Sequence, residues 1–293
     1  MNMDFKSAKE LLALCAENAL PISEVMRRRE CLLGEVEQDA VDRRMAKAWD
    51  IMRASATQPL ETPIKSMGGL IGGEAKTLQA HAAEGKGICG DMLQKAMTYA
   101  MAVLEVNASM GLIVAAPTAG SAGVVPGLLL ALQECYDLPD GRIVEALFNA
   151  GAVGYLAMRN ATVAGAVGGC QAEVGIASAM AASAAVELLG GTPQQCLDAA
   201  STVLMNMLGL VCDPVGGLVE YPCQNRNAAG VANALIAAEL SLSGIRQLIP
   251  FDQMLEAMYA VGKRLPAELR ETALGGCAAT PAACAACGLC SGN

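Results

Sequence analysis

The sequence predicts a mostly α-helical fold, in which apolar helices are joined by loops rich in glycine and proline. Of the 293 residues, 54% are hydrophobic but only 3% are aromatic. Alanine, glycine and methionine are abundant, and their small or flexible side chains suit closely packed helices, whereas strands favour aromatic and β-branched residues. Apolar residues recur at helical spacing, and we find no alternating strand series and no repeat of fixed period.

Residues 1–60 are predicted to form a polar, helical N-terminal segment. Ser7 is placed to cap a first helix, and Glu10, three residues later, is its partner in a capping box. Pro21 opens a second helix, and helical spacing continues beyond it. The basic run Arg27–Arg29 is followed at once by acidic residues, so we interpret it as a solvated helix face.

Residues 61–276 are predicted to form the main helical domain, which begins with a glycine-rich loop region over 62–90. From about residue 91 apolar helices dominate. They are separated by the breakers APTAGSAG (116–123), LPDG (138–141), GAVGGC (165–170), GGTP (190–193) and CDPVGG (212–217). A tail of small residues and cysteine follows over 277–293.

Charge and hydropathy argue against two classes of function. The net charge of −9 disfavours a nucleic-acid-binding surface. Residues 106–133 carry no charge, but prolines and glycines interrupt the unbroken apolar run of about 20 residues that a membrane helix needs, so we interpret them as buried interior. The N-terminus lacks the layout of a signal peptide, and we expect a cytoplasmic protein.

Two loops are candidate binding sites. The run GGLIGGEAKT resembles a phosphate-binding loop, but Ala75 stands where that motif needs glycine and no strand precedes it, so a nucleotide site is not predicted. In the second loop, Thr118 and Ser121 stand just before an apolar helix, whose free N–H groups would suit a carboxylate. Asn107 precedes this loop and is grouped with it as a substrate-binding candidate.

Three of the twelve cysteines differ from the others in their surroundings. Cys170, Cys212 and Cys223 lie beside glycine or proline breakers, on loops or helix ends. Others, such as Cys15, Cys135 and Cys196, are expected inside buried apolar stripes. In a chain of this size without an export signal, cysteines indicate metal or redox chemistry rather than disulfides. The spacing of Cys170, Cys212 and Cys223 along the sequence is wider than that of the close cysteine pairs in a zinc finger or a ferredoxin.

Four motifs give these residues a more specific interpretation. AAPTAGSAG, GGCQAEVG, CDPVGGLVEYPCQNRNAAG and LRETALGGCAATP occur in this order. Together they resemble the α-chain of the iron–sulfur L-serine dehydratases, over essentially the whole chain. The resemblance implies a helical catalytic domain whose loops hold a [4Fe–4S] cluster on Cys170, Cys212 and Cys223. It also implies an enzyme of serine catabolism that converts L-serine to pyruvate and ammonia.

A cluster with three thiolate ligands suits this reaction. One iron keeps an open position and acts as a Lewis acid, which makes the serine hydroxyl a better leaving group and the Cα proton easier to remove. Arg226 and Asn227 follow Cys223 within one helical turn, and we assign them to substrate binding or cluster support.

The base that removes the Cα proton is not identified by the sequence. His81 is the only histidine, and Lys65, Ser66 and Lys76 are further candidates. In the family a Ser-Ser-His motif lies in a separate β region, and this chain has no such motif. Either the base is local or a β subunit contributes to the site. The oligomeric state, a homo-oligomer included, is left open.

The tail departs from the family pattern and has three interpretations. In related single-chain enzymes a cysteine near the C-terminus occupies the open iron until substrate displaces it, and Cys290 is the candidate here. Alternatively, Cys277, Cys284, Cys287 and Cys290 hold a second cluster with four thiolates. The third interpretation is a redox-sensitive tail without a defined site.

Two other functions compete with the dehydratase. An L-cysteine desulfidase would use the same open-iron scaffold and release sulfide instead of water. A non-catalytic iron–sulfur carrier would need the cysteines but not the large apolar body. A pyridoxal-phosphate enzyme is not predicted, because no lysine stands in a strand-then-helix setting with a phosphate cradle.

Overall fold

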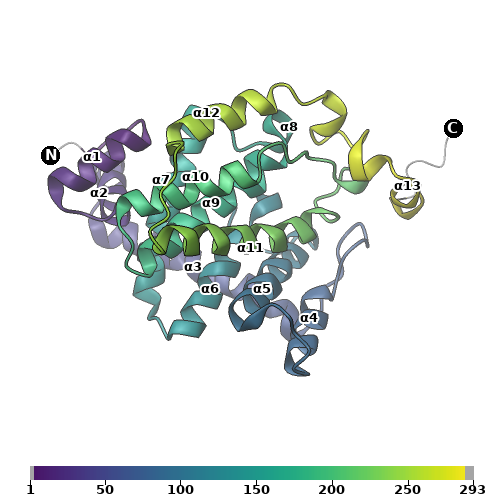
Figure 1. The fold of residues 1–293 in the computed structure, drawn as a ribbon. Helices are drawn as coiled ribbons and strands as arrows, with labels where there is room; N and C mark the ends of the chain where they lie inside the picture. Colours follow the sequence, from purple (N-terminus) through teal and green to yellow (C-terminus); the bar gives the residue numbers. More distant parts are fainter. Residues whose placement is uncertain (1–2, 288–293) are drawn as a thin grey trace.

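The computed structural model describes residues 3–287, and within them its regular structure is entirely helical (Figure 1). No strand forms in this part of the chain. Its one isolated bridge joins Cys212 and Arg270. The predicted mostly α-helical class is therefore confirmed.

Thirteen α-helices and four short 3-10 helices make up the described fold. The α-helices are α1 (Ala8–Asn18), α2 (Ile22–Gly34), α3 (Gln38–Glu61), α4 (Glu74–Ala83), α5 (Gly90–Ala108), α6 (Val124–Tyr136), α7 (Asp140–Asn160), α8 (Gly165–Gly168), α9 (Cys170–Leu188), α10 (Pro193–Asn206), α11 (Cys223–Leu242), α12 (Phe251–Gly262) and α13 (Pro281–Cys287). The 3-10 helices are η1 (Ala119–Ser121), η2 (Val215–Gly217), η3 (Ala267–Leu269) and η4 (Gly276–Ala279).

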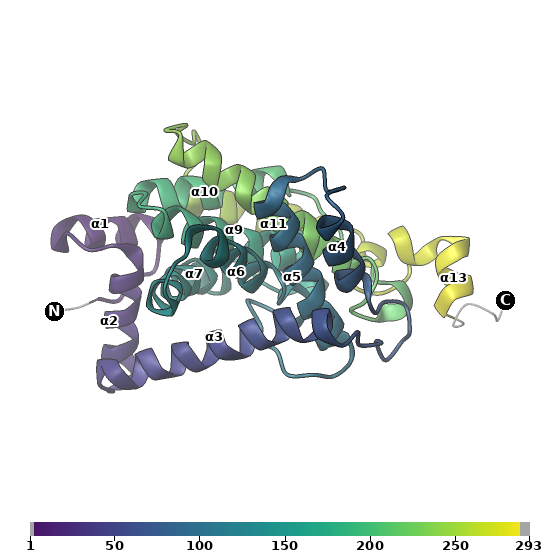
Figure 2. The same ribbon diagram turned by 90° about the horizontal axis from the view of Figure 1, so that it is seen from below.

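Helix α9 is the centre of the fold. It packs against α6, α7, α10, α11 and α12, and it lies in the middle of the molecule in both Figure 1 and Figure 2. Every residue of α9 is buried except Glu173 and Glu187. A helix that is apolar all round belongs in a protein core, and the Ala-rich sequence of α9 meets that condition.

Glycines permit the closest helix crossings. A Cβ atom on Gly123 would lie 2.2 Å from the carbonyl oxygen of Ala100, at the crossing of α5 and α6. A Cβ atom on Gly230 of α11 would lie 2.8 Å from Ser178 Oγ and 2.9 Å from Val174 Cγ1, both on α9. The low aromatic content therefore reflects helices packed almost backbone to backbone.

The first helices form largely as the sequence predicts. Ser7 caps α1, since its hydroxyl accepts a hydrogen bond from the N–H of Glu10 at 3.1 Å. The carboxylate of Glu10 accepts a hydrogen bond from Lys6 N. In a capping box it would accept from the N–H of Ser7, so the reciprocal hydrogen bond falls one residue earlier than predicted. Side chains of this segment, Trp49 among them, join the same buried cluster as the central helices.

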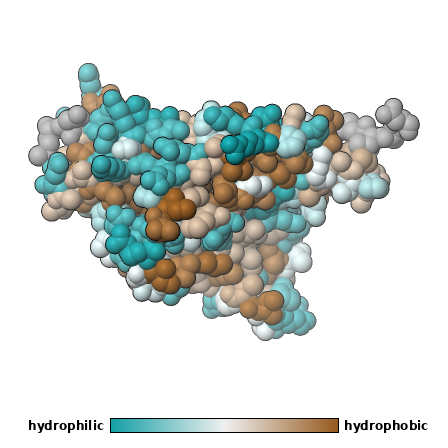
Figure 3. All heavy atoms as spheres, turned by 45° about the horizontal axis from the view of Figure 1, so that its top comes forward, coloured by the Kyte–Doolittle hydropathy of each residue, from teal (hydrophilic) through white to brown (hydrophobic). Residues whose placement is uncertain are grey.

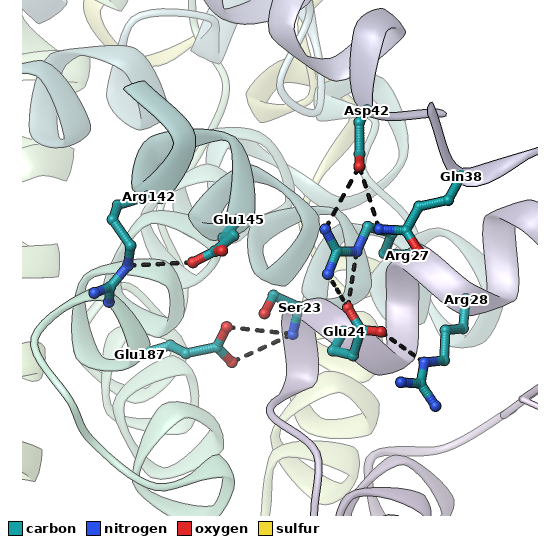
Figure 4. Close-up of polar contacts among 9 residues, drawn as sticks. All are labelled: Ser23, Glu24, Arg27, Arg28, Gln38, Asp42, Arg142, Glu145 and Glu187. Atoms are coloured by element: carbon teal, nitrogen blue, oxygen red, sulfur yellow. Dashed lines mark hydrogen bonds and ion pairs between the residues drawn. The ribbon is translucent and has the colours of Figure 1, made fainter. Parts of the chain in front are cut away.

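The three arginines of the basic run on α2 contact other side chains instead of only facing solvent. Figure 4 shows Arg27 and Arg28 both paired with Glu24, and Arg27 also with Asp42 of α3. Arg29 is only 7% exposed, and its guanidinium carbon lies 3.9 Å from the ring centre of Tyr155. The interpretation as a solvated face is therefore wrong for Arg29, which anchors α2 to α7.

Two further expectations are corrected by the structure. The predicted loop region 62–90 contains helix α4, whose N-terminus is held because Glu105 on α5 accepts a hydrogen bond from Ala75 N at 2.9 Å. Cys135, expected inside a buried stripe, is exposed in the last turn of α6, whereas Cys15 and Cys196 are buried as expected.

The surface mixes polar and apolar residues. Figure 3 shows brown apolar groups distributed among teal polar ones on the face that it presents. None of the helices within residues 3–287 combines the length and the apolar character needed to cross a membrane.

The α9–α11 crossing gives a stability prediction. Gly230→Ala should lower the free energy of unfolding by about 1–3 kcal/mol, because the added methyl group overpacks the crossing. Gly141→Ala on α7 is the matched control, since a Cβ atom there meets nothing within 4 Å. This control should be neutral or stabilising by up to about 1 kcal/mol. Thermal or urea unfolding measures both, and equal stabilities would contradict the packing argument.

Candidate functional site

The three cysteines singled out by the sequence come together from three separate elements. Cys170 is the first residue of α9, Cys223 is the first residue of α11, and Cys212 lies in the loop before η2. Burial raises the pKa of Cys212, and the negative charges of Glu173, Cys170 and Cys223 raise it further. The sulfur of Cys212 lies 3.7 Å from Glu173 Oε2, one helical turn after Cys170 on α9, so the loop of Cys212 meets the start of α9.

The surroundings of these thiols fit a bound cation. Burial raises the pKa of Cys170 to about 11 and that of Cys223 to about 12, so that neither thiol ionises readily in the absence of a positive group. The N-termini of α9 and α11 contribute partial positive charge. Within residues 3–287 no three Cys, His, Asp or Glu side chains surround a single point. A cluster does not require this, because its thiolates bind different iron atoms.

The loop that carries Cys212 is fixed by the segment 269–271. Cys212 N donates to the carbonyl oxygen of Leu269 at 2.9 Å, and Glu271 N donates to the carbonyl oxygen of Cys212 at 2.6 Å. Glu271 has a φ of 64°, in the left-handed region that non-glycine residues rarely adopt. Non-glycine residues in this conformation gather at functional sites, and this one belongs to the LRETALGGC motif.

Arg226 lies between the cysteines and the tail. Its Nη1 atom lies 2.7 Å from Asp213 Oδ1 and donates to the carbonyl oxygen of Val211 at 2.9 Å. The positive charge of Arg226 also counteracts the rise in the pKa of Cys170 that burial causes. The two contacts of Nη1 hold the guanidinium against Asp213 and Val211, in a position where its charge acts on Cys170.

Asp213 also holds the start of the tail. Its Oδ2 atom accepts a hydrogen bond from Cys277 N at 2.6 Å. A Cβ atom on Gly276 would lie 2.1 Å from the same oxygen, so only glycine fits there. Cys277 also lines a cavity of about 410 Å³ between the tail and the loops of Leu70 and Tyr221.

Asn227 connects the PTAGSAG loop to α11. Its side-chain oxygen accepts from Gly123 N at 3.1 Å, and its Nδ2 atom donates to the carbonyl oxygens of Gly120 and Cys223 at 2.8 and 2.9 Å. The side chain is fully buried. Asn227 therefore positions both the loop and the helix that begins with Cys223.

The PTAGSAG loop meets a carboxylate that the sequence analysis did not select. Thr118 Oγ1 donates to Glu173 Oε1 at 2.9 Å and lies 3.0 Å from Ser121 Oγ. The other oxygen of Glu173 lies 3.7 Å from the sulfur of Cys212. Burial raises the pKa of Glu173, and the negative charge of Glu271 adds to this. A signal was present, since Glu173 is the only charged residue in 160–186.

The candidate bases occupy different environments. Ser66 is buried, and its hydroxyl donates to Glu220 Oε2 at 2.7 Å. Lys65 and His81 are exposed, and neither forms a hydrogen bond or an ion pair with the described part of the chain. Asn107 is half-buried near the end of α5.

The tail cysteines are only partly described. Cys284 and Cys287 lie on α13, where their thiols contact the carbonyl oxygens of Ala278 and Cys284 at 3.8 and 3.6 Å. Cys290, the candidate ligand of the open iron, lies outside the described residues, so its role stays a prediction.

Comparison with known proteins identifies the family of the chain. A family described as serine dehydratase alpha chain matches residues 17–290. The chain belongs to this family. It is 48% identical to a probable L-serine dehydratase alpha chain of Bacillus subtilis, over 94% of this chain and 92% of the relative. It is 46% identical to an L-serine dehydratase alpha chain of Peptoniphilus asaccharolyticus, over 93% of each chain. The resemblance seen in the four motifs is thus confirmed.

Some members of the family are longer. An L-serine dehydratase of Helicobacter pylori is 37% identical over 94% of this chain, but the match covers only 62% of that relative. The L-serine dehydratase 1 of Escherichia coli shows the same relation, with 36% identity and 61% of its length covered. The serine dehydratase alpha chain therefore corresponds to one part of these longer proteins.

The loop of Ser66 gives a prediction about local order. Glu220, only 2% exposed, also accepts hydrogen bonds from Gly68 N at 2.7 Å and Leu70 N at 2.9 Å. Glu220→Ala should accelerate amide hydrogen exchange across residues 66–71 by about tenfold or more, because three donors lose a charged acceptor. The exposed Glu84→Ala serves as control. Unchanged exchange in the Glu220 variant would show that this carboxylate does not order the loop.

Proposed function

We propose that this chain is the catalytic α subunit of an L-serine ammonia-lyase, and that Cys170, Cys212 and Cys223 hold a [4Fe–4S] cluster. The observation that carries the proposal is the placement of these three thiols: Cys170 and Cys223 begin α9 and α11, and Cys212 contacts Glu173 one helical turn after Cys170. The names of the relatives support the substrate, because those matched over nearly their full length are L-serine dehydratase alpha chains.

The chain's residues then have distinct tasks. The cluster would supply a Lewis-acidic iron with an open position. Arg226, held by Asp213, places a positive charge beside Cys170. Asn227 fixes the PTAGSAG loop, so that Thr118 and Ser121 face the site in a set orientation. These groups orient an amino acid for loss of its Cα proton and its hydroxyl.

The base is proposed to act where a second chain covers this one. Ser66 is engaged by Glu220, whereas Lys65 and His81 are exposed. An exposed side chain in water is a poor partner for a buried Cα proton, and a covering chain would exclude that water. We therefore infer that Lys65, His81 or a residue of the β subunit takes the proton only in the assembled enzyme.

The β subunit is inferred from the names of the relatives, because an alpha chain is named as one chain of an enzyme that has a further kind of chain. Three exposed apolar side chains offer a contact surface on the loops around the site: Met67 (76% exposed), Met110 (82%) and Leu218 (38%). Met67 N bonds the carbonyl oxygen of Ala108, which brings the first two loops together.

The ligand assignment is tested by three substitutions. Cys170→Ser, Cys212→Ser and Cys223→Ser should each abolish the visible absorption of the reconstituted cluster and the formation of pyruvate from L-serine, because one thiolate of the cluster is lost. Cys135→Ser, at an exposed position, is the control and should retain both. A Cys212→Ser protein with a full complement of iron and full activity would contradict the ligand assignment. Turnover of L-cysteine but not of L-serine would favour the desulfidase instead.

The partner proposal has its own test. The chain alone should be nearly inactive after reconstitution, and adding the β chain should restore turnover. The double change Met67→Glu and Met110→Glu should weaken β-chain binding by about tenfold or more, because charge would be buried at the contact. Leu248→Glu is the control, since Leu248 is 93% exposed beyond the opposite end of α11 from Cys223. Full activity of the single chain would reject the proposal.

A further inference from the structure

We propose that Glu173 binds the α-ammonium group of the amino-acid substrate and so selects amino acids over other small carboxylic acids. This inference rests on the proposed function, because it assigns one part of the substrate to one side chain of that site. Glu173 stands one helical turn after Cys170, on the first turns of α9.

The position of Glu173 is unusual for a charged residue. It is the only charged side chain between Arg159 and Glu187, in a helix that is otherwise buried from Cys170 to Val186. A carboxylate in such surroundings loses much of its hydration, which is costly unless other groups replace the water. A structural carboxylate would be expected to have a full set of protein partners, as Glu220 has.

The described partners of Glu173 do not satisfy it. One oxygen accepts a single hydrogen bond from Thr118 Oγ1, and the other has only the weak thiol contact with Cys212. Within residues 3–287 no Lys, Arg or His side chain pairs with it. Arg226, the cation that influences Cys170, is paired with Asp213 instead.

Two glycine backbones lie close to this carboxylate. A Cβ atom on Gly165 would lie 2.6 Å from Glu173 Oε2 and 2.9 Å from the sulfur of Cys212, so a side chain there would crowd both groups. A Cβ atom on Gly120 would lie 3.6 Å from Glu173 Oε1. Glu173 itself stays partly exposed beside Cys212, which is where the substrate is placed by the proposed function.

The charges of the site match an amino-acid zwitterion. The anionic Glu173 lies beside Cys212 and the PTAGSAG loop, whereas the cationic Arg226 lies beside Cys170. An α-ammonium group offers three donors to a carboxylate in short, charge-assisted hydrogen bonds. It would be repelled near Arg226. The α-ammonium group of L-serine is therefore the cation that Glu173 lacks, and its binding would fix the Cα atom between the two sides.

The test uses two ligands that cannot lose a hydroxyl group. L-alanine and propionate share a carboxylate and differ in that only L-alanine carries an ammonium group. Their dissociation constants are measured by titration calorimetry on the reconstituted complex with the β chain. The wild-type complex should bind L-alanine about 10- to 100-fold more tightly than propionate. In Glu173→Gln this ratio should fall to near one, through weaker binding of L-alanine alone.

The matched control is Glu187→Gln, the other acid of α9, which accepts hydrogen bonds from Ser23 N and Asn149 at the opposite end of the helix from Cys170. It should keep the wild-type ratio. Glu173→Asp retains the charge and should keep a preference for L-alanine. Equal binding of both ligands by the wild-type complex overturns the proposal, as does an equal loss for both ligands in Glu173→Gln, which would indicate a purely structural role.

Two further readouts keep the result interpretable. Circular dichroism shows whether the Glu173→Gln protein folds, and its iron content shows whether it binds the cluster. If it does not, the ligand ratios of the wild-type complex and of Glu173→Asp decide, and an absent preference in either overturns the proposal. Pyruvate formation from L-serine by the wild-type complex is scored separately. Its absence would reject the proposed function, whereas an unselective but active enzyme would reject only the role of Glu173.

Discussion

Burial of α9 on all sides is the constraint on which the rest of the structure depends. Six α-helices pack around it, and the crossing with α11 requires Gly230. Since α9 begins with Cys170 and α11 begins with Cys223, the same packing brings two candidate ligands to one end of the crossing. The core and the site are thus consequences of one arrangement, and a change that separates these helices affects both.

The remaining parts of the site are attached to this frame by polar contacts. Asn227 links the PTAGSAG loop to α11, Glu220 holds the loop of Ser66, and Asp213 holds the start of the tail. Each of these three side chains is buried and belongs to the motif that runs from Cys212 to Gly230. One continuous segment therefore supplies two candidate ligands and the anchors for three other loops.

The sequence predicts this frame well and its long-range contacts poorly. Composition and breakers suffice for the helical class and for the helix starts at Cys170 and Cys223. Helix α4 was not predicted from the sequence, because its N-terminus is stabilised by Glu105, which lies 30 residues from the N–H group that it binds. The burial of Arg29 depends on the ring of Tyr155. Glu173 could have been selected as a lone charge, but its contacts with Thr118 and Cys212 depend on the tertiary fold.

The charge balance of the site explains why this chain is built to receive other groups. Burial raises the pKa of Glu173, Cys212 and Cys223, and the negative charge of Glu271 adds to each of these shifts, while Arg226 is paired with Asp213. With pKa values of about 11 and 12, Cys170 and Cys223 hold their protons at neutral pH. Binding of the proposed cluster would release these protons, and the positive charge that replaces them would lower the repulsion on Glu173. An ammonium group placed beside Glu173 would extend the same compensation to the substrate.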